Sequence, residues 1–143
     1  MKYLAVIGSF ILCACADPRA PEHAVPKSII SEHIRAFNAG DVEAMAKMQH
    51  PDIEWLSVSG TNLSIEVSGR EALSQNMTEY FKSPTKVTGQ LRGWSINMPY
   101  ISVTETATWA TKDGTENSQS SLTVYELDNN LIRRVWYYPA VEN

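Results

Sequence analysis

The chain has 143 residues, of which 43% are apolar and 20% are charged. This length and apolar content suit one globular domain and exclude an intrinsically disordered chain. The balance of 12 basic and 16 acidic residues gives a net charge of −4, which argues against a nucleic-acid-binding protein, because such proteins present basic surfaces to phosphate. The two cysteines, Cys13 and Cys15, cannot supply a disulfide framework for the body of the chain, because no cysteine follows Cys15.

The N-terminus has the pattern of a signal peptide: a basic start, the apolar stretch Tyr3–Leu12 and then small residues. The run Leu12-Cys13-Ala14-Cys15 resembles the lipobox of bacterial lipoproteins. This resemblance implies cleavage after Ala14 and a lipid anchor on the thiol of Cys15. Because Ala16 follows in place of Asp, the outer membrane facing the periplasm is the expected location in the bacterial cell envelope. An ordinary secretory signal cleaved near the same position is the alternative.

The sequence therefore divides into three parts: a signal peptide over residues 1–14, a lipid-anchored tether over 15–27 and a folded domain over 28–143. Three of the seven prolines fall between Ala16 and Lys27, and few side chains there are suited to packing. We expect this segment to be extended, with His23 in solvent.

Apolar residues at helical spacing predict three helices in the domain. The first begins near Ser28 and ends at Asn38-Ala39-Gly40. Asp41 caps the second, which ends at His50-Pro51, so that His50 is interpreted as a capping residue. The third follows Gly69 and continues to Ser83-Pro84.

Alternating apolar and polar residues predict six strands. Short turns connect most of them, which favours antiparallel neighbours. The fold class is therefore α+β, with helices gathered on one face of the sheet. The predicted strands are 53–59, 63–67, 87–97, 100–111, 118–127 and 131–138.

Several motifs in this order resemble the SnoaL-like branch of the nuclear transport factor 2-like superfamily. The resemblance implies a cone-shaped α+β barrel, in which a curved, mainly antiparallel sheet wraps around about three N-terminal helices and encloses a pocket. Members are often dimers, which implies a homodimer here. The motifs are Phe37-Asn38-Ala39-Gly40-Asp41, His50-Pro51-Asp52-Ile53-Glu54-Trp55, Gly69-Arg70-Glu71-Ala72-Leu73, Val124-Tyr125-Glu126-Leu127-Asp128 and Ile132-Arg133-Arg134-Val135-Trp136-Tyr137-Tyr138.

The superfamily includes ketosteroid isomerases, whose catalytic positions can be carried over by this resemblance. Their oxyanion-stabilising Tyr corresponds to His33, their general-base Asp to Ser57 and their protonated Asp to Thr123. Because neither Ser57 nor Thr123 is a base of suitable pKa, this chemistry is poorly supported. His33 is left as the titratable group, either as an acid–base residue or as a hydrogen-bonded core histidine.

Glu105 is a second candidate, because it alternates with Val103, Ala107 and Trp109 along one strand. If that face is enclosed, burial raises the pKa of the Glu105 carboxyl and makes it an alternative base. If the opposite face is the inner one, Glu105 is a solvated edge charge.

Further residues are expected around a ligand pocket. By the family pattern Arg134 points inward, where it pairs with Glu105 or holds an anionic ligand. The other expected pocket residues are Trp55, Ser57, Tyr80, Trp109, Thr123, Trp136 and Tyr138.

No spacing of ligands for a metal and no glycine-rich phosphate loop is recognised, so we expect no metal and no cofactor. Two functions remain. The first is a pocket protein that binds a small, partly apolar molecule or a protein partner without catalysis. The second is an isomerase, dehydratase or cyclase that uses His33, with Glu105 as a possible partner. The expected contacts are a small-molecule ligand, a membrane through the lipid anchor only, no nucleic acid and a second copy of the chain.

Overall fold

The structure is a computed structural model that describes residues 20–143, so the predicted signal peptide and Cys15 lie outside the described residues. The helices are α1 (Ala20–Ala39), α2 (Val42–Lys47) and α3 (Arg70–Tyr80). The strands are β1 (Gln49–Ser59), β2 (Asn62–Ser68), β3 (Val87–Asn97), β4 (Tyr100–Ala110), β5 (Glu116–Asp128), β6 (Leu131–Tyr137) and β7 (Val141–Glu142).

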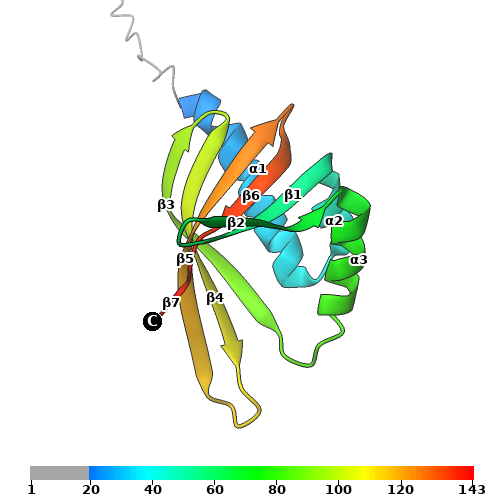
Figure 1. The fold of residues 1–143 in the computed structure, drawn as a ribbon, viewed down its shortest axis with the longest axis vertical. Coiled ribbons are helices and arrows are strands. Elements are labelled where there is room, and N and C mark those ends of the chain that lie inside the picture. The colour runs from blue at the N-terminus through cyan, green and yellow to red at the C-terminus, as the bar shows by residue number, and fades with distance from the viewer. Residues whose placement is uncertain (1–19) are drawn as a thin grey trace, which may run out of the picture.

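The strands form one curved sheet in the order β2-β1-β6-β5-β4-β3, with β7 paired to β5 (Figure 1). All neighbours are antiparallel except β1 and β6, which run parallel. The α+β class is confirmed. The expectation of a closed barrel is wrong, however, because β2 and β3 do not pair and the sheet stays open between these two strands.

Helix α1 begins eight residues before the predicted start near Ser28, so residues 20–27 are helical where an extended tether was expected. Pro21 lies in the first turn, where a missing N–H costs no hydrogen bond. Pro26 lies inside the helix and removes one backbone donor, yet the helix continues and buries Ile30 completely in the core. Prolines were therefore a poor guide to where this helix begins.

The predicted end of α1 is confirmed. Gly40 has a φ of +69°, which a residue without a side chain adopts at little cost. Its N–H donates to the carbonyl of Phe37, and the N–H of Asp41 donates to that of Ala36, which closes the last turn. The Asp41 side chain then caps α2 by accepting from the N–H of Ala44 at 2.9 Å.

The second helix is shorter than predicted. It ends at Lys47, and β1 begins at Gln49, so His50 lies in a strand and does not cap a helix. The Nδ1 atom of His50 instead accepts from the backbone N–H of Asp52 at 3.1 Å.

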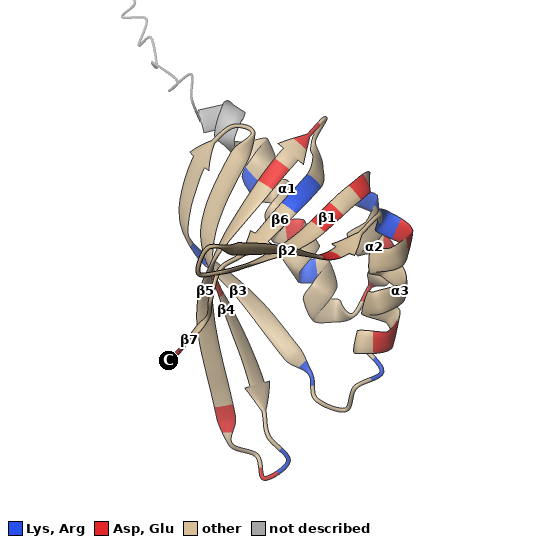
Figure 2. Cartoon of the chain, viewed as in Figure 1, with Lys and Arg blue, Asp and Glu red and all other residues tan. Residues whose placement is uncertain are grey.

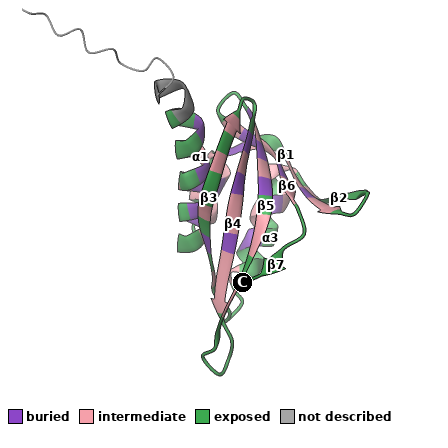
Figure 3. Cartoon of the chain, turned by 90° about the vertical axis from the view of Figure 1, so that its left-hand side faces the viewer, coloured by how far each residue is buried: buried purple, intermediate pink, exposed green. Residues whose placement is uncertain are grey.

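The helices cover one face of the sheet, and the core lies between them. Buried positions lie along the middle of the strands, whereas the hairpin ends and β2 are exposed (Figure 3). Asn38 fastens α1 to β3: its side chain donates to the carbonyl of Gly89 at 2.9 Å and accepts from the Gly89 N–H at 2.7 Å. A Cβ on Gly89 would meet Ile34 Cγ2 at 3.3 Å, so glycine permits this close approach.

A bulge in β6 determines which of its side chains face the helices. Ile132 pairs with Leu127 and Arg134 with Glu126, which leaves Arg133 as an extra residue. An extra residue reverses the alternation of side chains. Ile132 and Val135 are therefore both buried, although they are three positions apart.

Candidate functional site

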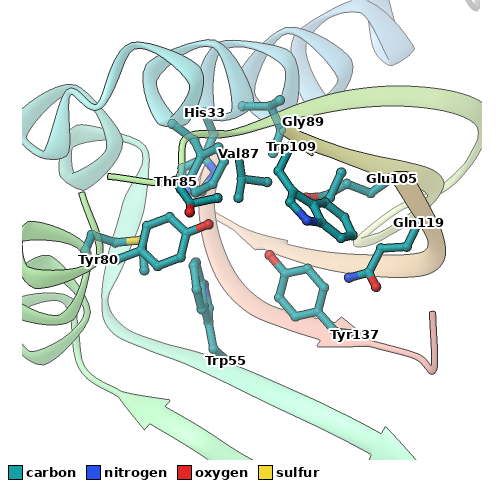
Figure 4. A pocket seen from close by; sticks show the side chains of 14 residues that line it. His33, Trp55, Tyr80, Thr85, Val87, Gly89, Glu105, Trp109, Gln119 and Tyr137 are labelled. Carbon is teal, nitrogen blue, oxygen red and sulfur yellow. The ribbon is translucent and has the colours of Figure 1, made fainter. Parts of the chain in front are cut away.

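A cavity of about 490 Å³ lies between the helices and the sheet, within the range of small-molecule sites. It receives side chains from α1, α3 and every long strand except β2. Figure 4 shows how they surround a common space. The lining residues are His33, Ile34, Phe37, Trp55, Met77, Tyr80, Thr85, Val87, Gly89, Glu105, Ala107, Trp109, Gln119 and Tyr137.

Glu105 is the one acidic residue among those lining residues. It lies on β4, on the same face as Ala107 and Trp109, so this face is the inner one. Burial raises the pKa of the Glu105 carboxyl, and hydrogen bonds from Tyr125 and Thr123 partly oppose that rise. Of the two interpretations of Glu105, the enclosed carboxyl is therefore the one that the structure shows.

The Glu105 carboxyl is linked to the hydroxyl groups of two tyrosines, Tyr125 and Tyr137. Tyr125, completely buried on β5, donates from its hydroxyl to Glu105 Oε2 at 3.0 Å. Tyr137 on β6 interacts in turn with the Tyr125 hydroxyl, and burial together with the negative charge of Glu105 raises the pKa of both phenols far above the usual value. Both tyrosines therefore keep their protons near neutral pH.

His33 lies on α1 and lines the same cavity, with only 2% of its surface exposed. Burial lowers the pKa of the His33 ring to about 4, so the imidazole is neutral at pH 7. The side-chain amide of Gln49 donates to His33 Nε2 over 3.1 Å, which places the ring proton on Nδ1. That nitrogen is buried and has no hydrogen-bond partner within the described residues.

Three of the expected pocket aromatics line the cavity: Trp55, Tyr80 and Trp109. Two other expected residues do not. Ser57 hydrogen-bonds to Glu66 on the neighbouring strand β2 at 2.5 Å. Thr123 is completely buried beneath the lining, where its hydroxyl supports the Glu105 carboxyl. Thr123 therefore acts on the site through another residue.

Arg134, Trp136 and Tyr138 were expected to point inward. The structure corrects this expectation, because none of the three lines the cavity. Arg134 lies between two acids of the adjacent strands, 2.7 Å from Glu54 and 2.9 Å from Glu126. Trp136 packs against exposed Tyr100 on the face away from the helices, with ring centroids 6.2 Å apart. Figure 2 shows acidic and basic positions together on β1, β5 and β6 toward one end of the sheet. The bulge at Arg133 explains this difference, because the expectation assumed regular alternation of side chains along the strand.

Sequence reasoning missed Tyr137, Gln119, Gln49 and Tyr125. Tyr137 was missed for the same reason that Arg134 was misplaced. Gln119 stands four positions before Thr123 and Tyr125 two positions after it on the inward face of β5, so strict alternation around Thr123 could have found them. Gln49 was assigned to a helix, which concealed its position opposite Ile132 at the start of β1.

The described residues hold no group of three or more His, Cys, Asp or Glu side chains suited to a metal ion. Across residues 20–143, no helix is both long enough and apolar enough to span a membrane.

Comparisons with known proteins agree with this fold. A family model described as a SnoaL-like domain matches residues 30–135. No curated protein sequence matches the chain.

Solved structures with a similar fold include three of interest, all at low sequence identity. An epoxide hydrolase of Mycobacterium tuberculosis described as LEH-like has a TM-score of 0.67 and 11% identity, covering 82% of this chain and 84% of that one. The epoxide hydrolase/cyclase-like enzyme SalBIII of salinomycin formation has a TM-score of 0.64 and 20% identity, covering 79% and 88%. Rv0760c of M. tuberculosis, solved with estradiol-17β-hemisuccinate, has a TM-score of 0.65 and 16% identity, covering 80% and 93%.

Proposed function

The chain belongs to the SnoaL-like domain family, with a nuclear transport factor 2-like fold, and from this premise we propose that it binds a small, mainly apolar molecule in its cavity. The observation that carries the proposal is the cavity itself. Its walls are largely aromatic and aliphatic, and a few polar groups, among them Glu105, Gln119 and the Tyr137 hydroxyl, enter it from different strands. Such a combination holds an apolar body and orients it through a small number of polar contacts.

The binding proposal is tested by filling the cavity. Ala107 lines it from β4, whereas the next residue, Thr108, points to the opposite face of the sheet. Ligands that raise the melting temperature of the wild type should do so equally in Thr108→Trp and should have no effect on Ala107→Trp. Equal stabilisation of both variants by the same ligand would place binding outside the cavity.

A second candidate is an enzyme that transfers a proton, favoured by the presence of Glu105 and His33 in one cavity. With a ring pKa of about 4, His33 is a weak base, and its Nε2 lone pair is engaged by Gln49. Glu105, with a raised pKa, is better suited than His33 to exchange a proton. This assignment reverses the order expected from the sequence.

Proton transfer and binding are separated by one comparison. For any substrate that the protein turns over, Glu105→Gln should abolish turnover while retaining binding, and His33→Asn should reduce it less. Unchanged turnover in Glu105→Gln would exclude Glu105 as the acid–base group.

The lipid anchor and the homodimer are further proposals. The sequence at residues 12–15 supports cleavage before Cys15 and lipidation of its thiol, which would hold the domain at the bacterial envelope. Cys15→Ser should abolish labelling by a radioactive fatty acid in cells. Sedimentation of residues 20–143 at micromolar concentration should show a dimer, and a monomer would contradict that expectation.

A further inference from the structure

The cavity has a marked asymmetry of charge. Its described lining contains one carboxyl group, Glu105, and no lysine or arginine. His33 is neutral at pH 7 because burial lowers its pKa to about 4. Lys86 lines an adjacent hollow and not this cavity. An anionic ligand would therefore meet a carboxyl group and no cation, whereas a cationic ligand would meet its counter-ion.

Aromatic rings form much of the remaining wall. Phe37, Trp55, Tyr80, Trp109 and Tyr137 all contribute. Figure 4 shows the rings of Trp55, Tyr80, Trp109 and Tyr137 around the space that Glu105 borders. The rings of Trp55 and Tyr137 pack edge to face with centroids 5.7 Å apart, so they form one continuous part of the wall. The faces of such rings attract cations, and more strongly where water is excluded.

The orientation of the carboxyl group leaves one oxygen toward the cavity. Oε2 accepts the hydrogen bond of Tyr125 at 3.0 Å. Oε1 faces Gly89, 3.8 Å from the point where a Cβ would stand, and Gly89 itself lines the cavity. Glu105 Oε1 therefore lies beside the bare backbone of Gly89 in the cavity wall.

The surroundings of Glu105 act on its pKa in opposite directions, and the net effect is a rise. Hydrogen bonds from Tyr125 and Thr123 favour the carboxylate, and desolvation favours the neutral acid. A cation in the cavity would stabilise the carboxylate further, because charges attract strongly where water is excluded.

From the single carboxyl group, the missing basic residues and the aromatic walls, we propose that the ligand is an organic ammonium ion with an apolar body. This inference rests on the proposed binding function and names the ligand class for the same cavity. The ammonium group would lie beside Glu105 Oε1, and the apolar part would pack against Trp55, Trp109 and Tyr137.

Three probes of similar size and different charge test this inference by calorimetric titration. They are phenyltrimethylammonium, its uncharged carbon isostere tert-butylbenzene, and the anion phenylacetate. We expect the ammonium ion to bind the wild type at least tenfold more tightly than tert-butylbenzene, and phenylacetate to bind most weakly. Glu105→Gln should remove the preference for the cation and leave the affinity for tert-butylbenzene unchanged.

Two variants complete the design. Glu116→Gln, at an exposed position at the start of β5, removes one acid outside the cavity and should keep the full preference. Trp109→Leu should weaken the ammonium ion more than tert-butylbenzene, and it covers the case in which Glu105→Gln fails to fold.

The outcomes separate the two proposals. If tert-butylbenzene or phenylacetate binds as tightly as the ammonium ion, the ligand class is wrong while the binding function stands. The same holds if Glu105→Gln and Trp109→Leu both keep the preference. If none of the three probes binds, both the ligand class and the binding function are contradicted.

Discussion

The hydroxyl of Tyr125 donates a hydrogen bond to Glu105 Oε2 over 3.0 Å, from β5 to the adjacent strand β4. Tyr125 is completely buried, so its hydroxyl cannot exchange the hydrogen bond to the carboxyl group for one to water. Tyr125 thus orients Glu105 from behind the cavity wall without lining the cavity itself.

Removing this hydroxyl should raise the pKa of Glu105 further, because the hydrogen bond from Tyr125 favours the carboxylate. Tyr125→Phe should also lower the free energy of unfolding by about 1 kcal/mol, the usual value for one buried hydrogen bond. Carbon-detected NMR titration of the Glu105 carboxyl and urea unfolding measure the two effects. Tyr100→Phe is the control, since Tyr100 is exposed, and it should change neither. A Glu105 pKa that falls in Tyr125→Phe would contradict this relationship.

His33 should make the protein less stable in acid. Its pKa is about 4 in the folded protein and about 6.5 when unfolded, so the unfolded state binds more protons between these values. Stability therefore rises with pH from about 4 to 6.5, by up to about 3 kcal/mol. Urea unfolding of His33→Asn should show a shallower dependence on pH in this window. An unchanged slope in His33→Asn would refute the assignment.

Gly89 permits the close packing of α1 on β3. Gly89→Ala would place a methyl group 3.3 Å from Ile34 Cγ2, and we expect a loss of about 1 kcal/mol in thermal or urea unfolding. Replacing Ile34 by Leu removes that Cγ2 atom, so the double variant should lose less stability than the sum of the two single variants. Additive losses would show that the two side chains do not meet.

Arg134 should stabilise the end of the sheet by pairing with two acidic side chains at once. Arg134→Met leaves Glu54 and Glu126 without their shared cation, and the expected loss is about 1 kcal/mol because the pair is partly exposed. The loss should shrink in 1 M salt, which screens the charges. Arg35→Met, at an exposed helix position beside Glu32, is the matched control and should cost less. A loss that does not change with salt would indicate packing in place of charge.

Strand boundaries were well predicted where turns are short and alternation is regular. The bounds of β3 agree with the prediction at both ends, and β4 and β5 differ by one or two residues. Local patterns determine these features, because each strand is bounded by its own turn residues. The end of α1 at Gly40 was predictable for the same reason.

The features that were missed depend on contacts between distant parts of the chain. The bulge at Arg133 arises from the pairing of β5 with β6, and no local pattern marks it. Because of this bulge, Tyr137 lines the cavity, whereas Arg134 and Trp136, which were expected there, do not. The hydrogen bonds between Asn38 and Gly89 span 51 positions and likewise have no local signature. Three of the eight expected pocket residues therefore line the cavity, Trp55, Tyr80 and Trp109, and all three lie outside the reach of the bulge.

The binding of a small, mainly apolar molecule inside the cavity is tested most directly by methyl NMR spectra recorded during titration with tert-butylbenzene or phenyltrimethylammonium. We predict saturable shifts at the cavity methyl groups of Ile34, Met77, Val87 and Ala107, with no shifts at the exposed Leu63 and Leu122. Shifts confined to the exposed leucines, or no saturable shift with either probe, would contradict the proposed function.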